Sequence, residues 1–379
     1  MGFPIRDVPL PVTPFMSKLF SPITLASLEL SNRVVVAPMC QYSAADGSAT
    51  DWHMTHLGML ANSGAALVVV EATHVERHGR ITHGCHGLYS DANEDAIRRV
   101  LLHCRRIGSA KFGVQLAHSG RKGSSQRPWD GGKGLKRDED PWETVAPSSI
   151  AYGNEWPAPR EATHADIARI REAFVNSAKR AIAIGFDAVE LHLAHGYLLH
   201  TFLSPLSNQR KDEFGGSLEN RMRFPLEVAR LVRAVVPKSI PLGARVSATD
   251  WVEGGWTIED SVKLCRALKA EGLDFICTSS GGILFATRAP HDVDNNAALA
   301  EKIRREAGIA TRAVGLITEP QKAEDIVARG QADQIAIARG FLDDPHWAWH
   351  AAKQLGGEVK RPDQYLRAGP QFWPPARPK

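Results

Sequence analysis

Eight short apolar segments recur along the chain at roughly even spacing, and each has the length of a β-strand. Most of them are almost continuously apolar, which is typical of strands that are covered on both faces. A parallel sheet flanked by helices produces this pattern. The segments comprise residues 33–39, 66–73, 111–118, 187–193, 241–248, 274–281, 313–317 and 334–339.

Helical patterns lie between several of these segments. Thr163 and Asp166 resemble a capping box, and apolar residues follow them at helical spacing until Gly185. A helix that ends at a glycine before a strand is the expected connection of a βα unit. Further helices are predicted over residues 217–236, 258–270 and 319–328.

Eight βα units in a chain of 379 residues predict a single closed (β/α)₈ barrel, the TIM barrel. The competing interpretation is an open doubly wound sheet, but no GxGxxG motif follows the first strand. We expect an N-terminal arm over residues 1–17, the barrel over 18–356 and a C-terminal tail over 357–379. The segment after the third strand, residues 121–148, has the length of a lid or a mobile loop.

Composition excludes several classes of protein. The 46 basic and 42 acidic residues are too balanced for a protein that binds nucleic acid by neutralising phosphates. No apolar run approaches the ~18 residues of a membrane span, and the N-terminus lacks the apolar core of a secretory signal. The five cysteines show no CxxC spacing, which argues against a disulfide framework, a zinc finger or an iron–sulfur cluster. We therefore expect a cytoplasmic protein that binds neither nucleic acid nor membranes.

Polar residues collect where the chemistry of a (β/α)₈ barrel is found, at the C-terminal ends of the strands. One of them, Arg245, lies within the fifth apolar strand itself. The others are Cys40, Glu71, Gln115, His118, His192, His195, Ser279, Ser280 and Arg339.

Arg245 is the most informative of these residues, because a charge inside a barrel is costly without an anionic or acceptor partner. Small residues, including Gly243, share its face of the strand, and Gln115 is flanked in the same way. This spacing suggests room for a flat polar ligand at the mouth of the barrel. The alternative, with equal weight from position alone, is an internal ion pair with Glu71 or Glu190.

His192, His195 and Tyr197 follow the fourth strand in the pattern HxxHxY. The two histidines could polarise a carbonyl group, lie satisfied in the core, or bind a metal together with His118 or Glu71. An unperturbed tyrosine has a pKa of ~10, so Tyr197 would be protonated at neutral pH and able to protonate a carbanion. It could equally be an aromatic residue that covers the rim.

The last two strands suggest a phosphate site. Gly315 ends the seventh strand and Arg339 ends the eighth, where barrels of this class commonly bind phosphate with backbone N–H groups. Arg339 would pair with the phosphate oxygens. The alternative is an ordinary surface arginine.

Four motifs occur in order along the chain: residues 32–33 with 37–42 (NR, APMCQY), 115–121 (QLAHSGR), 192–198 (HLAHGYL) and 204–224 (SPLSNQRKDEFGGSLENRMRF). Together they resemble the old yellow enzyme family of FMN-dependent ene-reductases, from about Lys18 to Gly356. Cys40 with Tyr42 is similar to the thermophilic-like branch, which includes bacterial xenobiotic reductases.

The resemblance implies that FMN lies across the barrel mouth. It places Gln115 and Arg245 at the pyrimidine edge, and it places Gly315, Ala338 and Arg339 at the phosphate. Ala338 departs from the glycine that is usual in the family. The residues implied to line the flavin ring are Ala37, Pro38, Met39, Cys40 and Ala72.

The resemblance also implies a reaction. NADPH would reduce the flavin, and an electron-poor alkene would then bind with its oxygen on His192 and His195, positioned by Tyr42. Tyr197 would protonate the α-carbon. Arg367 would reach the active site of a neighbouring subunit in a homodimer or homotetramer. The alternatives are a metal-dependent barrel hydrolase that uses the two histidines and a barrel that only binds a ligand.

Overall fold

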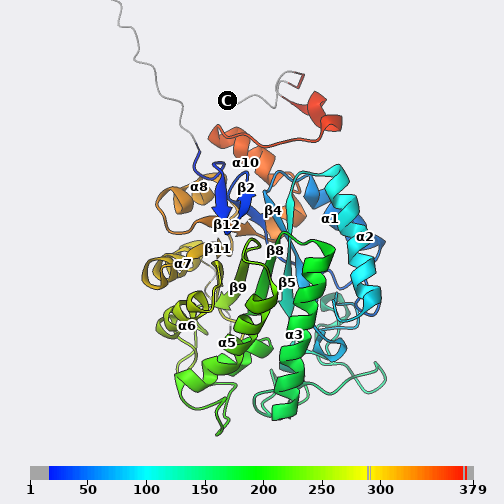
Figure 1. Ribbon diagram of the computed structural model, residues 1–379, viewed down its shortest axis with the longest axis vertical. Helices are drawn as coiled ribbons and strands as arrows, with labels where there is room; N and C mark the ends of the chain where they lie inside the picture. The colour runs from blue at the N-terminus through cyan, green and yellow to red at the C-terminus, as the bar shows by residue number, and fades with distance from the viewer. Residues whose placement is uncertain (1–16, 288–289, 291, 370–371, 374–379) are drawn as a thin grey trace, which may run out of the picture.

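Eight parallel strands close into a barrel in the computed structural model (Figure 1), which describes residues 17–287, 290, 292–369 and 372–373. The predicted (β/α)₈ fold is therefore confirmed. Around the barrel the strands follow in chain order, and β12 pairs with β3 to close it. The strands are β3 (Val34–Val36), β4 (Leu67–His74), β5 (Lys111–Ala117), β8 (Ala188–Leu193), β9 (Leu242–Ser247), β10 (Phe275–Ser279), β11 (Ala310–Val314) and β12 (Gln334–Ile337).

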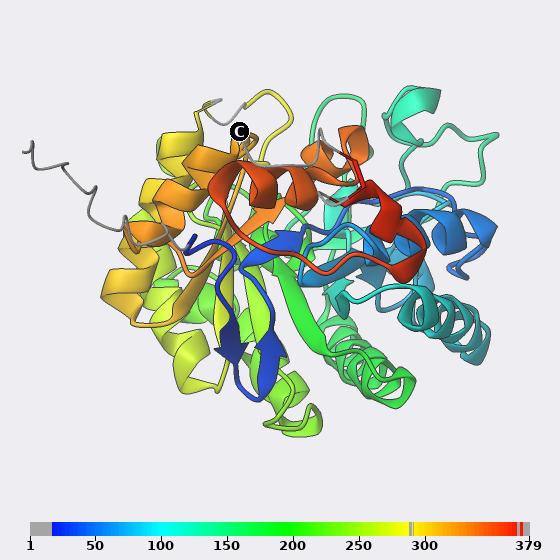
Figure 2. The same ribbon diagram turned by 90° about the horizontal axis from the view of Figure 1, so that it is seen from above.

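Helices surround the strands on the outside (Figures 1 and 2). The predicted capping box of α3 is confirmed: Thr163 Oγ1 accepts from the backbone of Asp166, whose carboxylate accepts from the backbone of Thr163. The helices are α1 (Asp51–Ala61), α2 (Asp91–Ile107), α3 (His164–Ile184), α4 (Leu198–Leu203), α5 (Leu218–Val235), α6 (Ile258–Ala270), α7 (Val293–Ala307), α8 (Pro320–Ala328), α9 (Arg339–Asp343) and α10 (Trp347–Leu355).

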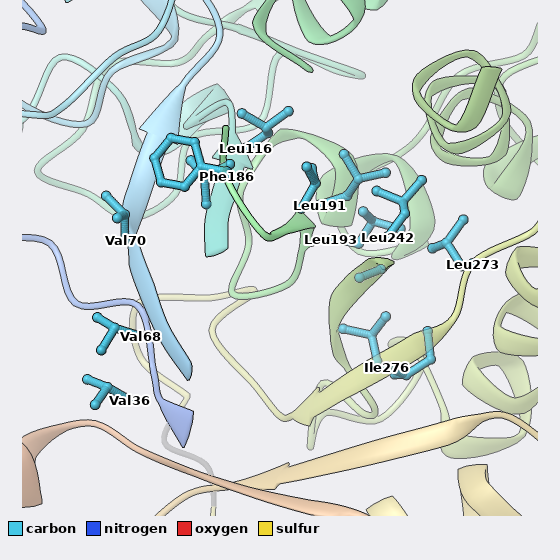
Figure 3. Packing of buried hydrophobic residues seen from close by; sticks show 14 of the residues in the cluster. Val36, Val68, Val70, Leu116, Phe186, Leu191, Leu193, Leu242, Leu273 and Ile276 are labelled. Carbon is cyan, nitrogen blue, oxygen red and sulfur yellow. The ribbon is translucent and has the colours of Figure 1, made fainter. Parts of the chain in front are cut away.

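The period-two alternation of the strands separates two apolar clusters. Outward-facing residues such as Val36 and Val68 form one cluster with helix residues such as Leu57 of α1, and Figure 3 shows part of this cluster. Inward-facing residues such as Val35 and Leu67 form a second cluster at the N-terminal end of the barrel. The hairpin of β1 (Ile23–Leu25) and β2 (Leu28–Leu30) belongs to this inner cluster and covers that end. Polar residues line the opposite end of the barrel, where the C-terminal ends of the strands lie.

The seventh strand corrects the prediction from sequence. We predicted residues 313–317, but β11 spans Ala310–Val314. The polar residues Thr311 and Arg312 interrupt the apolar pattern, although both are buried. Arg312 is neutralised inside the barrel, with its Nη1 3.2 Å from Glu190 Oε2. Gly315 therefore directly follows the strand rather than lying within it.

The segment after β5 consists of short turns of 3₁₀ helix and one small sheet. It contains η2 (Gly120–Lys122), η3 (Pro128–Asp130), β6 (Val145–Ala146) and β7 (Arg160–Glu161). The predicted extended loop therefore contains short turns with hydrogen bonds of their own, such as that from Leu135 N to Ser124 O at 2.8 Å, while residues 128–131 are exposed. A shorter turn, η1 (Arg77–Gly79), follows β4.

The two ends of the chain differ in what can be described. Of the predicted N-terminal arm, residues 1–16 lie outside the described part, and Ser17 donates a hydrogen bond to Glu324. The tail contains η4 (Asp363–Ala368), where Tyr365 packs on Trp349 of α10 with ring centroids 6.0 Å apart. Across the described residues, no helix combines the length and apolar character that a membrane span requires.

Candidate active site

The end of β8 and the start of α4 bring His192, His195 and Tyr197 together. The His192 ring lies edge to face with both neighbours, at centroid distances of 5.1 Å from His195 and 4.9 Å from Tyr197. The backbone N–H of Ala194 donates to His192 Nδ1 at 3.2 Å. The three residues of the HxxHxY pattern therefore form one cluster, as predicted.

The backbone of His195 adopts a left-handed conformation, with φ of +60°. Its N–H donates to Ser247 Oγ at 2.9 Å, and this hydroxyl donates to the carbonyl of Gly281 at 2.8 Å. A Cβ on Gly282 would lie 2.7 Å from His195 Cα, so only glycine fits at this crossing. The loops that follow β8, β9 and β10 thus fix one another, and they hold His195 Nε2 2.7 Å from Ser279 Oγ.

Burial sets the protonation states of the cluster. It lowers the pKa of His192 and the pKa of His195 well below the ordinary 6.5, with a smaller contribution from Arg245. Both imidazoles are therefore neutral at pH 7. Because His192 Nδ1 accepts a hydrogen bond, its proton is on Nε2 and can be donated. Burial also raises the pKa of Tyr197 well above 10, so this phenol keeps its proton.

Arg245 lies on β9, directly beside His192 in the sheet register. Its Nε is buried without a hydrogen-bond partner, and in the described part of the chain it forms no ion pair. Glu190 is instead held by Arg312 and by Gln115, whose Nε2 donates to it at 2.7 Å. The predicted alternative, a pairing of Arg245 with a barrel glutamate, is therefore wrong. A partly buried guanidinium whose Nε has no partner suits a ligand that supplies acceptor atoms.

We predicted that Gly243 leaves space for a flat ligand, but the structure gives this glycine another role. A Cβ at this position would lie 2.4 Å from the ring of Phe275. The glycine therefore accommodates an aromatic side chain of the next strand rather than a ligand. Phe275 in turn lies under the guanidinium of Arg312, 4.5 Å from the ring centroid, so this layer of the barrel is filled by protein.

The loop after β3 contains residues 37–40, which we predicted to line a flat ligand. Glu71 fixes this loop, because its carboxylate accepts from the backbone of Gln41 at 2.9 Å and pairs with His53 Nε2 at 3.2 Å. A register shift between Val70 and Ala72 marks a β-bulge at Glu71. Sequence reasoning found Glu71 but missed this role, and it missed His53 entirely.

Cys40 and Tyr42 lie in the same loop and are both partly buried. Burial raises the pKa of the Cys40 thiol well above its usual range, so it stays neutral and behaves as a small soft group. Tyr42 has a left-handed backbone with φ of +51°, and its ring meets Trp129 edge to face at 5.8 Å. All five cysteines are free thiols, as the absence of CxxC spacing predicted.

The loops after β11 and β12 adjoin because these strands pair, with Val314 opposite Ala336. Gly315 has φ of +126°, and the amide of Asn296 would be 2.2 Å from any Cβ added there. Ala338 has a negative φ of −103°, so its methyl group meets no left-handed strain. The exposed Arg339 follows it. Asn296, which also accepts from Ser280 at 3.0 Å, was not identified from sequence.

Arg367 is not part of this cluster within one chain. It is exposed on η4, and the tail lies along a groove shared with residues 106–109, where α2 ends and β5 begins. That is the N-terminal rim of the barrel, opposite the histidines.

The sequence left open whether His192 and His195 bind a metal. Within the described ranges, the ligand atoms that converge belong to His164, Asp212 and Glu213, and neither His192 nor His195 is among them.

Lys122 is the most important site residue that sequence reasoning missed. Its Nζ donates to the carbonyl of His195 at 2.8 Å. The same ammonium lies 5.0 Å from the ring centroid of Tyr197 and 4.3 Å from that of Tyr152. The available signal was its position, directly after the motif of residues 115–121.

Comparison with known proteins matches nearly the whole barrel. The sequence model described as the NADH:flavin oxidoreductase / NADH oxidase family matches residues 18–358. An NADPH dehydrogenase of a Geobacillus species is 42% identical over 351 residues, covering 92% of this chain and 98% of the relative. An NADPH dehydrogenase of Listeria monocytogenes is 40% identical over 355 residues, covering 93% and 99%. The solved structure of morphinone reductase is 26% identical with a TM-score of 0.75, covering 92% of both chains.

Proposed function

We propose that this chain, which belongs to the NADH:flavin oxidoreductase / NADH oxidase family, reduces activated C=C bonds with NADPH as the reductant. Membership of the family confirms the resemblance to the old yellow enzymes, and the protein is an FMN-dependent NAD(P)H oxidoreductase. The substrates that we propose are enones, enals, maleimides and nitroalkenes. Cys40 and Tyr42 favour its thermophilic-like branch.

The residues at the barrel mouth fit FMN. The unpartnered Nε of Arg245 suits the electron-rich pyrimidine edge of an isoalloxazine, and Gln115 on β5 would contact the same edge. Gly315, Ala338 and Arg339 stand on adjoining loops that offer backbone N–H groups and a cation to the phosphate. The ring would be lined by Ala37, Pro38, Met39, Cys40 and Ala72, on the loop that Glu71 fixes and on β4.

Bound FMN would supply hydride transfer between NADPH and the β-carbon of the alkene. We expect NADPH and the alkene to use the same site in turn, which predicts ping-pong kinetics. The protein supplies the polarisation. The neutral His192 donates from Nε2, and with His195 it would bind the carbonyl or nitro oxygen of the substrate. Withdrawal of electrons through that oxygen makes the β-carbon electrophilic. Tyr42 would help to place the substrate.

Tyr197 would complete the reaction as the proton donor. Its raised pKa keeps the phenol protonated throughout the neutral range. As negative charge develops on the α-carbon, the O–H bond breaks and a C–H bond forms. The 4.9 Å contact with His192 sets the phenol beside the group that polarises the substrate.

Arg245 carries this proposal, because a buried guanidinium nitrogen without a partner needs an acceptor. For Arg245→Met we expect FMN affinity to fall by about 10- to 100-fold, the loss typical of a charge-assisted hydrogen bond. Fluorescence titration of the apoprotein with FMN measures it. The control is Arg305→Met at an exposed arginine, which should bind FMN like the wild type. Undiminished affinity in Arg245→Met would reject the assignment.

The proposal also covers the domain bounds, the cellular location and the oligomeric state of the protein. We expect a barrel over residues 18–356 in a cytoplasmic homodimer or homotetramer. Because Arg367 lies at the opposite rim from the histidines, it could reach an active site only in a neighbouring subunit. The metal-dependent hydrolase is not favoured, because within the described residues neither His192 nor His195 belongs to a group of three converging ligand atoms.

A further inference from the structure

Lys122 has three neighbours that are unusual for a lysine. It ends η2 after β5, and its ammonium is enclosed between the rings of Tyr152 and Tyr197. A third contact is the hydrogen bond to the carbonyl of His195, which has the left-handed backbone described above. One cation therefore contacts both the proposed proton donor and one of the two histidines that would bind the substrate oxygen.

The aromatic side of this contact is itself anchored. Tyr152 packs edge to face on Trp156 at 5.1 Å, and the indole of Trp156 donates to Ser125 Oγ at 2.8 Å. Trp156 also lies 5.1 Å from Phe285, on the loop after β10. The segment after β5 thus holds Tyr152 over the lysine and limits the access of water to the ammonium.

We propose that Lys122 is a positioning residue for the proton transfer, which stabilises the phenolate of Tyr197 while the carbonyl of His195 holds the ammonium in place. The inference rests on the proposed function. When the Tyr197 O–H bond breaks and the α-carbon takes the proton, one negative charge remains on the phenol. A cation over the ring face, 5.0 Å from its centroid, attracts the phenolate far more than it attracts the neutral phenol.

The charge of Lys122 changes within the working pH range. Burial, and next Arg121, lower its pKa to about 7. The titratable groups that face it from other described elements are His192, His195, Tyr197 and Tyr152. Burial lowers the pKa of both histidines and raises the pKa of both tyrosines, so none of them changes charge between pH 6 and 9. The cation is present below pH 7 and is lost above it, so proton transfer should slow as pH rises.

The test uses FMN-loaded protein, reduced with NADPH and mixed anaerobically with cyclohexenone at pH 6 to 9. For the wild type we expect the reoxidation rate to fall about tenfold with a midpoint near pH 7, a value typical of a perturbed lysine. Lys122→Met should be about tenfold slower at pH 6 and independent of pH. Lys122→Arg keeps a permanent charge, so it should retain the fast rate across the range.

Two controls separate positioning from general damage. Lys136→Met, at an exposed lysine of the same segment, should match the wild type. In the Tyr197→Phe background, Lys122→Met should cause no further slowing, because there is no phenolate left to stabilise. A tenfold additional loss there would mean that the lysine acts only on structure, and it would overturn the proposal.

A second readout does not depend on turnover. In protein labelled with carbon-13 at the lysine ε-carbons, the signal that disappears in Lys122→Met should titrate near pH 7. A midpoint near the ordinary lysine value of ~10.4 would also overturn the proposal. If the reduced wild type is not reoxidised by any alkene, the proposed function fails and this inference fails with it. Normal turnover with a wild-type profile in Lys122→Met rejects the inference alone.

Discussion

At the scale of single residues, the side chains proposed to bind the substrate oxygen and to donate the proton are uncharged at neutral pH. Burial keeps His192 and His195 uncharged and Tyr197 protonated at pH 7. A neutral imidazole can donate to a substrate oxygen without presenting a full charge that would attract water or anions. Arg245 lies beside His192, and its Nε has no hydrogen-bond partner among the described residues, as its proposed role at the cofactor requires.

Replacement of Tyr197 tests the proton donor. In Tyr197→Phe the ring is kept but the proton is lost, so reduction of the bound flavin by NADPH should proceed near the wild-type rate. Reoxidation by an enone should slow by about 100-fold, at the lower end of what general acid catalysis contributes. Rapid mixing separates the two steps. An unchanged reoxidation rate would remove Tyr197 from this role.

Sequence reasoning identified these residues because their chemistry is local. HxxHxY after a strand places three polar side chains at a barrel mouth whatever the rest of the fold does. Lys122 could not be assigned in this way. Its role depends on Tyr152, which follows 30 residues later in an irregular segment and returns to the site only through aromatic packing.

At the scale of elements, the barrel contains a charged layer that an apolar pattern hides. Arg312 on β11 pairs with Glu190 on β8 across the interior and donates to Gln334 on β12. An arginine inside the pattern displaced the predicted strand by three residues, since a search for continuous apolar runs passes over it. Strands without an internal charge, such as β5, begin at the predicted residue.

Removal of one partner of the Arg312–Glu190 ion pair should destabilise the folded protein. Arg312→Met leaves the carboxylate of Glu190 buried without its cation, which typically lowers the free energy of unfolding by about 3–5 kcal/mol. Arg329→Met, at an exposed arginine, should change it by less than about 0.5 kcal/mol. Adding Glu190→Gln to Arg312→Met should recover part of the loss. Denaturant unfolding measures all three, and a near-neutral Arg312→Met would contradict the role of this layer.

At the scale of the whole molecule, buried neutral histidines link stability to pH. Burial lowers the pKa of His86 to about 3, and it lowers those of His74, His192 and His195 well below 6.5. The unfolded chain binds protons at these positions below pH 6.5 and the folded chain does not. Stability is therefore complete above about pH 6.5 and falls as the pH decreases toward the folded values.

Thermal and urea unfolding at pH 7 and pH 5 should reveal this linkage. Each histidine that stays neutral when folded should cost about 2 kcal/mol of stability at pH 5 relative to pH 7. His86→Gln should reduce the fall by that amount, whereas His78→Gln, at an exposed histidine, should leave it unchanged. Equal stability at the two pH values would refute the linkage.

The central claim concerns the whole protein loaded with its cofactor, and a single anaerobic spectrum tests it most directly. FMN-loaded protein should lose its visible flavin absorption when one equivalent of NADPH is added. Subsequent addition of an enone should restore the absorption in full, with one equivalent of saturated ketone formed. Absorption that NADPH leaves unchanged, or that returns with oxygen but not with any enone, maleimide or nitroalkene, would contradict the account.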